Sequence, residues 1–120
     1  MQKTILSLCL GAVLLSSPLA FAKSDQMLLQ EAAKNQVSVA KAKTLKDETG
    51  VTLKGTIVKH IAGDDFEFKD ATGTIILDVD DDLWKPMQLK AGDKVKVMGE
   101  VDRHRSKPTD IEVIRLERLP

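Results

Sequence analysis

The sequence predicts a mainly β domain in which five strands close a small barrel. Three observations carry this prediction. From Val51 onward apolar residues alternate with polar ones, a period of two that is typical of half-buried strands. Turns rich in glycine, aspartate and proline divide this region into five such stretches. Two of the stretches contain a mid-strand glycine, Gly55 and Gly99, which suits the sharp coiling of a closed barrel.

The first 22 residues have the layout of a cleavable secretory signal. Lys3 is the positive end, Ile5 to Leu15 is an uncharged, mostly apolar run too short for a membrane span, and Ala20 and Ala22 supply the small residues of a cleavage site. Cys9 lies inside the run and leaves with the signal, so we expect neither a lipid anchor nor a disulfide. We therefore expect a periplasmic protein, the alternative being an uncleaved anchor.

The expected mature chain, residues 23–120, is nearly neutral. It keeps 17 of the 18 basic residues, because Lys3 is lost, and all 18 acidic ones, so its net charge is 17 − 18 = −1. A chain of this length buries enough surface to hold one domain without disulfides. The charge balance argues against bulk attraction to nucleic acid or to an anionic membrane.

Two helical stretches are expected before the first strand. Residues 23–36 are rich in Ala, Gln and Lys, and we expect a leader that is either flexible or loosely helical from about Asp25. Ser38 is a good N-cap for a short helix over residues 39–46, whose apolar residues recur at helical spacing. We expect the domain itself to span residues 37–120.

The first three strands are expected to form a meander. The first runs from Val51 to about Ile61, and its alternation slips at Val58, as in a bulged and bent strand. The second and third lie around residues 66–69 and 75–79, joined by a hairpin turn that ends at Gly73.

A helical connection and two more strands complete the domain. Asp81 or Asp82 is expected to cap one short helical turn that Pro86 ends. The last two strands are expected over residues 95–101 and from about Asp110 to Glu117. This order is that of an OB-type barrel. The alternative, an SH3-like barrel, would not place its helical connection between strands three and four.

Five segments in a fixed order carry a family resemblance. They are G-T-I-V (Gly55 to Val58), D-F-E-F-K-D-A-T-G-T-I (Asp65 to Ile75), D-V-D-D-D-L-W (Asp78 to Trp84), G-D-K-V-K-V-M-G-E-V-D (Gly92 to Asp102) and I-E-V-I (Ile111 to Ile114). With them the chain, from about Val37 to Leu119, resembles the bacterial OB-fold (BOF) family of YgiW/YdeI-like proteins. The resemblance implies a periplasmic OB barrel that contributes to stress tolerance, and it implies no catalytic residue. The connection from Leu89 to Gly92 and the basic loop from Arg103 to Pro108 depart from the family's pattern.

The acidic run after the third strand does not predict a calcium site. Asp78, Asp80 and Asp82 match the first three ligand positions of an EF-hand loop. Leu83 and Leu89 then stand where that loop needs a glycine and a bidentate glutamate. We expect a solvated strand face and a helix cap instead.

Metal and catalytic chemistry are not expected either. His60 and His104 lie far apart in the chain, and no cysteine remains to join them, so no metal ion or cofactor is expected. No serine lies in a nucleophile motif, and we expect no enzyme. Stacking of nucleic-acid bases needs exposed aromatic residues. Phe66, Phe68 and Trp84 are expected in the core or at the barrel end, so no nucleic-acid partner is expected.

The remaining expectation is that the protein binds a ligand other than a metal ion or nucleic acid. OB folds bind on the face of strands two and three, beside the first and fourth loops. We expect a small polar or anionic ligand such as a glycan, or an envelope protein, and no stable membrane insertion after signal cleavage. The alternative function is a structural or adaptor partner of an envelope or outer-membrane protein, without a small-molecule ligand. The basic loop itself is either part of the binding surface or simply solvated. The expected ligand-binding residues are Lys59, His60, Glu67, Lys69, Arg103, His104, Arg105 and Lys107.

Overall fold

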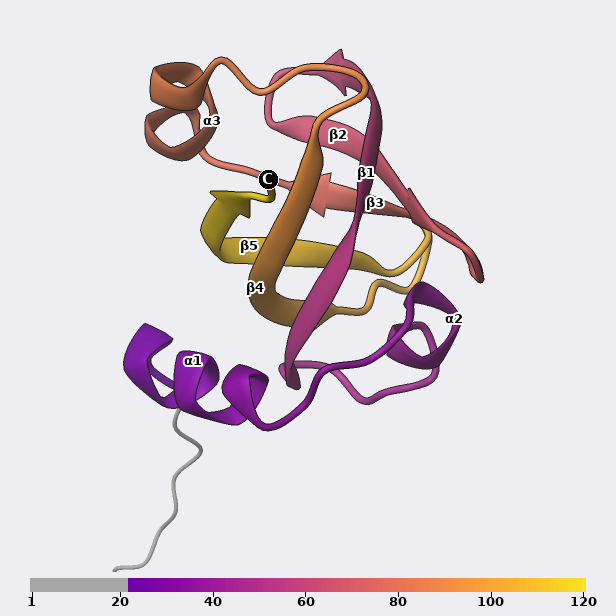
Figure 1. Ribbon diagram of the computed structural model, residues 1–120. Coiled ribbons are helices and arrows are strands. Elements are labelled where there is room, and N and C mark those ends of the chain that lie inside the picture. The colour runs from indigo at the N-terminus through magenta and orange to yellow at the C-terminus, as the bar shows by residue number, and fades with distance from the viewer. Residues whose placement is uncertain (1–21) are drawn as a thin grey trace, which may run out of the picture.

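A computed structural model describes residues 22–120, and the rest of the predicted signal, residues 1–21, lies outside the described part. The five predicted strands are present and close one barrel in the order β1-β2-β3-β5-β4 (Figure 1). In the described residues no helix is long and apolar enough to cross a membrane. The strands are β1 (Gly50–Ala62), β2 (Asp65–Asp70), β3 (Gly73–Asp78), β4 (Lys94–Asp102) and β5 (Asp110–Arg118).

The long strand β1 belongs to both sides of the barrel. Its first half pairs with β4 and its second half with β2, and Thr56 pairs with both. The β1–β2 register shifts between Ile57 and Lys59, which confirms the bulge predicted at Val58. A Cβ atom on Gly55 would lie 2.2 Å from the Lys69 carbonyl oxygen, so only glycine lets the two strands come this close.

β5 closes the barrel between β4 and β3. It pairs antiparallel with β4 over most of its length, and parallel with β3 at three positions only. The β4–β5 register shifts between Met98 and Gly99, where a Cβ atom would lie 2.2 Å from the Glu112 carbonyl oxygen. The second mid-strand glycine is therefore also a place of close backbone approach.

The core consists of the inward rows of the strands. Phe66 and Phe68 are fully buried, as predicted, together with the β3 residues that pair with them, Leu77 and Ile75. Burial of these apolar side chains is the main stabilising contribution.

The leader forms a helix, α1 (Asp25–Ala33), capped by the Ser24 hydroxyl. Of the two alternatives left open by the sequence, the helical one is present, and its buried residues Leu28 and Ala32 face the barrel. Hydrogen bonds from the Thr52 hydroxyl to the Ala32 carbonyl oxygen (2.7 Å) and from the Gly50 N–H to Glu31 Oε1 (3.0 Å) tie α1 to β1.

The helix α2 (Val39–Ala42) begins at the predicted cap, Ser38, but the prediction that it extends to residue 46 is wrong. After Ala42 the hydrogen bonds tighten to the i→i+3 pattern, from the Thr44 N–H to the Lys41 carbonyl oxygen and from the Leu45 N–H to the Ala42 carbonyl oxygen. The Arg103 guanidinium donates to the Lys43 and Leu45 carbonyl oxygens at 2.8 and 3.1 Å. The Leu45 side chain packs against the core after this turn.

The connecting helix α3 (Asp81–Met87) differs from its prediction in two ways. Asp80, rather than Asp81 or Asp82, is the N-cap, because its backbone is extended and its carbonyl accepts the first helical hydrogen bonds. Pro86 lies inside the helix instead of ending it. Near the C-terminal end of so short a helix the ring removes one backbone donor only, and Gln88 ends the helix in the left-handed conformation.

Candidate functional site

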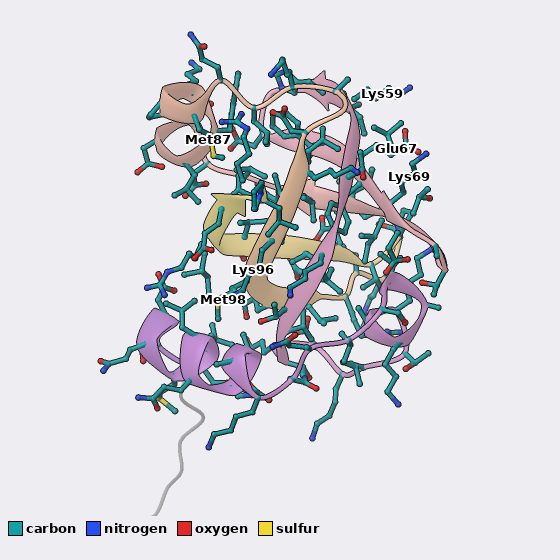
Figure 2. All side chains as sticks on the ribbon, viewed as in Figure 1. Lys59, Glu67, Lys69, Met87, Lys96 and Met98 are labelled. Carbon is teal, nitrogen blue, oxygen red and sulfur yellow. The ribbon has the colours of Figure 1, made fainter. Side chains whose placement is uncertain are left out.

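Three of the predicted site residues lie on one outer edge of the barrel. Lys59 on β1 pairs across the strands with Glu67 on β2, and Lys69 follows on β2. Figure 2 shows these three side chains one below the other and directed away from the barrel. They form a row of mixed charge in which Lys59 and Lys69 are exposed and Glu67 is half-buried.

His60 is part of the barrel end. Its ring stacks on Phe66 at 4.3 Å with an interplanar angle of 11°, and it contacts the Trp84 ring at 4.7 Å. Its Nε2 lies 2.7 Å from the Gly63 carbonyl oxygen. Trp84, on α3, packs edge-on against Phe66, which is the position expected for a plug of the barrel end.

The predicted basic loop is partly engaged with the protein itself. Arg103 donates its backbone N–H to Asp47 Oδ1 at 2.8 Å, in addition to the two guanidinium bonds described above. His104 turns toward Asp102 and Asp110. Arg105 and Lys107 are exposed.

The eight predicted residues therefore do not form one patch. Lys59 and His60 lie near the start of β2, where the Trp84 ring covers the barrel end. The Arg103 loop lies beside α2. The helix α2 is in turn bonded to the end of β2, because the Val39 N–H donates to Asp70 Oδ2 at 2.9 Å. Hydrogen bonds from Thr72, Val39 and Gly73 hold the pKa of Asp70 below its ordinary value, although burial alone would raise it.

A groove joins the β2–β3 face to the β4–β5 loop. It has a volume of about 280 Å³ and lies where OB folds commonly bind. Glu67 is the one predicted site residue in it. Its lining combines apolar with polar groups, and the residues are Lys43, Glu67, Thr74, Ile75, Ile76, Pro108 and Thr109.

An acidic ladder crosses four strands on the outside of the barrel. Asp65 on β2 pairs with Asp78 on β3, Asp78 pairs with Glu112 on β5, and Glu112 pairs with Glu100 on β4. Directly opposed like charges on neighbouring strands repel one another. We refer to Asp65, Asp78, Glu112 and Glu100 as the acidic ladder.

Partial burial and mutual repulsion raise the pKa values of three carboxyl groups in the ladder. Partial burial, and next the Asp110 carboxylate, raise the pKa of Asp78 above its ordinary value. Partial burial followed by the charge of Asp78 raises the pKa of Glu112, and partial burial followed by the charge of Glu112 raises that of Glu100. A cation or a basic surface on this face would relieve the repulsion.

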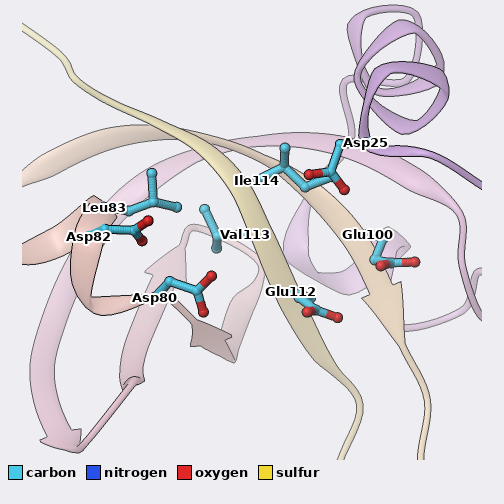
Figure 3. Close-up of a pocket in the computed structure, with 8 residues that line it drawn as sticks. All are labelled: Asp25, Asp80, Asp82, Leu83, Glu100, Glu112, Val113 and Ile114. Carbon is cyan, nitrogen blue, oxygen red and sulfur yellow. The ribbon is translucent and has the colours of Figure 1, made fainter.

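An acidic groove of about 230 Å³ lies over the part of the ladder formed by β5 and β4 (Figure 3). Carboxylates from α1, α3, β4 and β5 line it, around the apolar side chains of Val113 and Ile114 on β5. The acidic lining residues are Asp25, Asp80, Asp82, Glu100 and Glu112.

Two groups of side chains bring three potential metal ligands close together in the described residues. Asp64, Asp78 and Asp80 form one, so the spatial partner of the acidic run is Asp64 rather than the Asp82 of the rejected EF-hand pattern. Asp102, His104 and Asp110 form the other. Burial raises the pKa of Asp110, and His104 partly offsets this.

Sequence reasoning missed both the ladder and the second group. The available signal was acidic residues two apart in three strands, as in Glu100 with Asp102 and Asp110 with Glu112. Residues two apart share one face of a strand. The register that places Asp102 opposite Asp110 could not be obtained from that pattern alone.

Comparisons with known proteins agree on one family. A family model described as "Bacterial OB fold (BOF) protein" matches residues 16–118. The chain is 51% identical over 57 residues to the calcium-regulated OB-fold protein CarO of Pseudomonas aeruginosa, covering 48% of this chain and 49% of that protein. It is 43% identical over 79 residues to the protein YgiW of Escherichia coli K12, covering 65% of this chain and 61% of that protein.

The same likeness is found among solved structures. The structure of the hypothetical protein ygiW from E. coli matches with a TM-score of 0.65 and 38% sequence identity, covering 71% of this chain and 90% of that chain. The sequence match thus spans about half to three fifths of the two curated relatives, while the barrel corresponds to nearly the whole of the solved chain.

Proposed function

Because the chain belongs to the bacterial OB fold (BOF) family, we propose that it is an exported binding module of the periplasm that contributes to envelope stress tolerance. Its ligand is a small polar or anionic molecule such as a glycan. The observation that carries this proposal is the groove between the β2–β3 face and the β4–β5 loop. Binding rather than catalysis is its role.

The groove suits a ligand with both apolar and hydroxylated faces. Ile76 and Pro108 offer apolar surface, while Thr74 and Thr109 offer hydroxyl groups for hydrogen bonds. Lys43 lies in the groove and can pair with a carboxylate or phosphate of the ligand. The exposed Arg105 and Lys107 belong to the same β4–β5 loop as Pro108 and add positive charge there.

A titration of the 15N-labelled protein with peptidoglycan disaccharide peptides and lipopolysaccharide core sugars tests this function. We expect amide shifts confined to β2, β3 and residues 105–109. Lys43→Ala should weaken binding, whereas the control Lys34→Ala, which changes another exposed lysine just after α1, should not. Shifts located elsewhere, or no shifts with either glycan class, would overturn the proposal.

A second candidate function, an adaptor for an envelope protein, is favoured by the acidic ladder. Four strands present carboxylates in one row, and such a face is complementary to a basic protein segment. The same row disfavours nucleic acid, because phosphates would meet like charge.

A decalysine peptide is a suitable probe for the adaptor function. We expect salt-sensitive binding that is lost in the variant Asp78→Asn/Glu100→Gln/Glu112→Gln. The control Glu48→Gln/Glu117→Gln, which removes two exposed carboxylates outside the ladder, should bind as before. Equal binding by both variants would count against a specific face. Cell fractionation completes the test, because a cytoplasmic location contradicts both functions.

A further inference from the structure

We infer that Asp102, His104 and Asp110 form a binding site for a borderline divalent metal ion such as Zn²⁺. The site lies at the base of the β4–β5 loop. It is independent of the proposed function, so failure of metal binding would leave the glycan and peptide experiments interpretable.

The strand register brings the two carboxylates together. Asp102 is the last residue of β4, Asp110 is the first of β5, and they are directly paired across the hairpin. Directly paired residues point to the same face of a sheet. The intervening loop, residues 103–109, returns the His104 ring over this pair.

The distances suit a shared ion. His104 Nε2 lies 3.3 Å from Asp110 Oδ1 and 3.7 Å from Asp102 Oδ2, and the three ligand atoms are all within 4.8 Å of one another. Bonds of about 2.0–2.2 Å to zinc at tetrahedral angles place ligand atoms about 3.3–3.6 Å apart. A small adjustment of Asp102 would complete this arrangement.

Two of the three potential ligand atoms are buried and lack hydrogen bonds. Asp110 is 8% exposed. His104 Nε2 and Asp110 Oδ1 are two of the three buried side-chain polar atoms without a hydrogen-bond partner among the described residues. Such atoms are rare in folded proteins, and a bound ion or water is a common reason for them. Here the two atoms lie 3.3 Å from each other, beside Asp102.

The loop is held in place around the histidine. Arg103, the preceding residue, is bonded to Asp47 through its backbone and to the Lys43 and Leu45 carbonyl groups through its side chain. Because Arg103 is anchored in this way, His104 is already held near its position, and metal binding does not have to order the loop. Preorganisation of this kind lowers the entropic cost of binding.

The ligand set indicates the class of metal. One imidazole with two carboxylates suits Zn²⁺ and neighbouring divalent transition metals, whereas Ca²⁺ and Mg²⁺ prefer oxygen ligands only. Two carboxylates and a neutral imidazole carry a charge of −2, which matches a divalent ion. Three protein ligands leave a fourth position for water.

The competing explanation is an ion pair in which a doubly protonated His104 lies between the two carboxylates. Calorimetric titration of the untagged, EDTA-treated protein with ZnCl₂ distinguishes the two. We expect one ion per chain, a rise in the melting temperature, and a shift of the His104 ring nitrogens in 15N spectra. His104→Gln should weaken binding by about tenfold or more. The control His60→Gln, which changes the other histidine of the described residues, should leave it unchanged.

Asp102→Asn is the second variant, since Asp102 is less buried than Asp110 and its replacement is the milder change to the fold. It should also weaken Zn²⁺ binding while the circular dichroism spectrum stays that of the parent. Three results overturn the proposal: no Zn²⁺ binding, binding equally strong in His104→Gln, or a His104 ring that keeps both protons when Zn²⁺ is present.

Discussion

Asp93 and Arg118 connect the beginning of β4 to the end of β5 through a 2.8 Å bond between Arg118 Nη2 and Asp93 Oδ2. The Lys90 N–H donates to the same carboxylate at 2.9 Å. The bond from Arg118 is the main reason that the pKa of Asp93 falls from 3.8 to about 2. The Asp93 side chain is only 10% exposed, whereas that of Arg118 is 41% exposed.

This pair predicts an acid-sensitive contribution to stability. A carboxyl group with a lowered pKa stabilises the folded state above its unfolded pKa, and the contribution is lost as the pH falls from about 4 to about 2. After allowance for solvent screening at Arg118 we expect about 1 kcal/mol. Urea unfolding at several pH values should show a smaller loss of stability over this range in Asp93→Asn than in the parent, while Asp82→Asn should follow the parent.

We expect alanine to cost more stability at Gly55, where two strands approach closely, than at Gly63, which lies in an open turn. Gly55→Ala places a Cβ atom 2.2 Å from a backbone oxygen, so β1 and β2 must separate, and we expect a loss of about 3 kcal/mol or more. Gly63→Ala has open space around its Cβ but a φ of 52°, so we expect a loss of about 1 kcal/mol only. Equal losses in urea unfolding would show that close strand approach is unimportant.

The docking of α1 predicts a difference between two neighbouring residues. Leu28 is 2% exposed and Met27 is 55% exposed. Leu28→Ala should lower the free energy of unfolding by about 2–4 kcal/mol, whereas Met27→Ala should change it by less than about 0.5 kcal/mol. If both variants have the same free energy of unfolding as the parent, α1 contributes nothing to the stability of the barrel.

The acidic ladder predicts that removing a charge stabilises the protein. Glu112→Gln keeps the shape of the side chain and removes its repulsion with Asp78 and Glu100. At low salt we expect a gain of about 0.5–1 kcal/mol that shrinks in 0.5 M NaCl. Glu117, on the same strand, faces Lys96 instead, and Glu117→Gln should give no gain. Thermal melts at both salt concentrations provide the measurement.

The fold could be predicted from the sequence because each strand carries its own pattern. Phe66 and Phe68 alternate with charged residues, and Ile75 and Leu77 recur with the same period of two, so the inward face can be identified without reference to any partner. The lengths of the short helices could not be predicted in this way. The turn that follows α2 is held by Arg103, sixty residues later in the chain, which bonds to the Lys43 carbonyl oxygen.

The candidate sites depend even more on distant partners. The sequence of the Arg103 loop predicts a basic patch, but two of its residues are engaged with groups from the turn after α2, from β4 and from β5. Asp78 and Glu112 become neighbours only through the parallel pairing of β3 with β5. Local pattern indicates which face of a strand a residue occupies, whereas the register decides which residues it faces.

The pairing between β3 and β5 is short, so we expect these two strands to separate more easily than any other neighbouring pair in the barrel. Only three residue pairs join these strands, compared with eight between β4 and β5. Amide hydrogens around this pairing should exchange with solvent through local opening, well before those of β1 and β4, which open only with global unfolding. Asp78, Asp110 and Glu112 all lie along the β3–β5 pairing. A cation or a basic partner bound there would therefore stabilise the closed barrel and slow the exchange of these amide hydrogens.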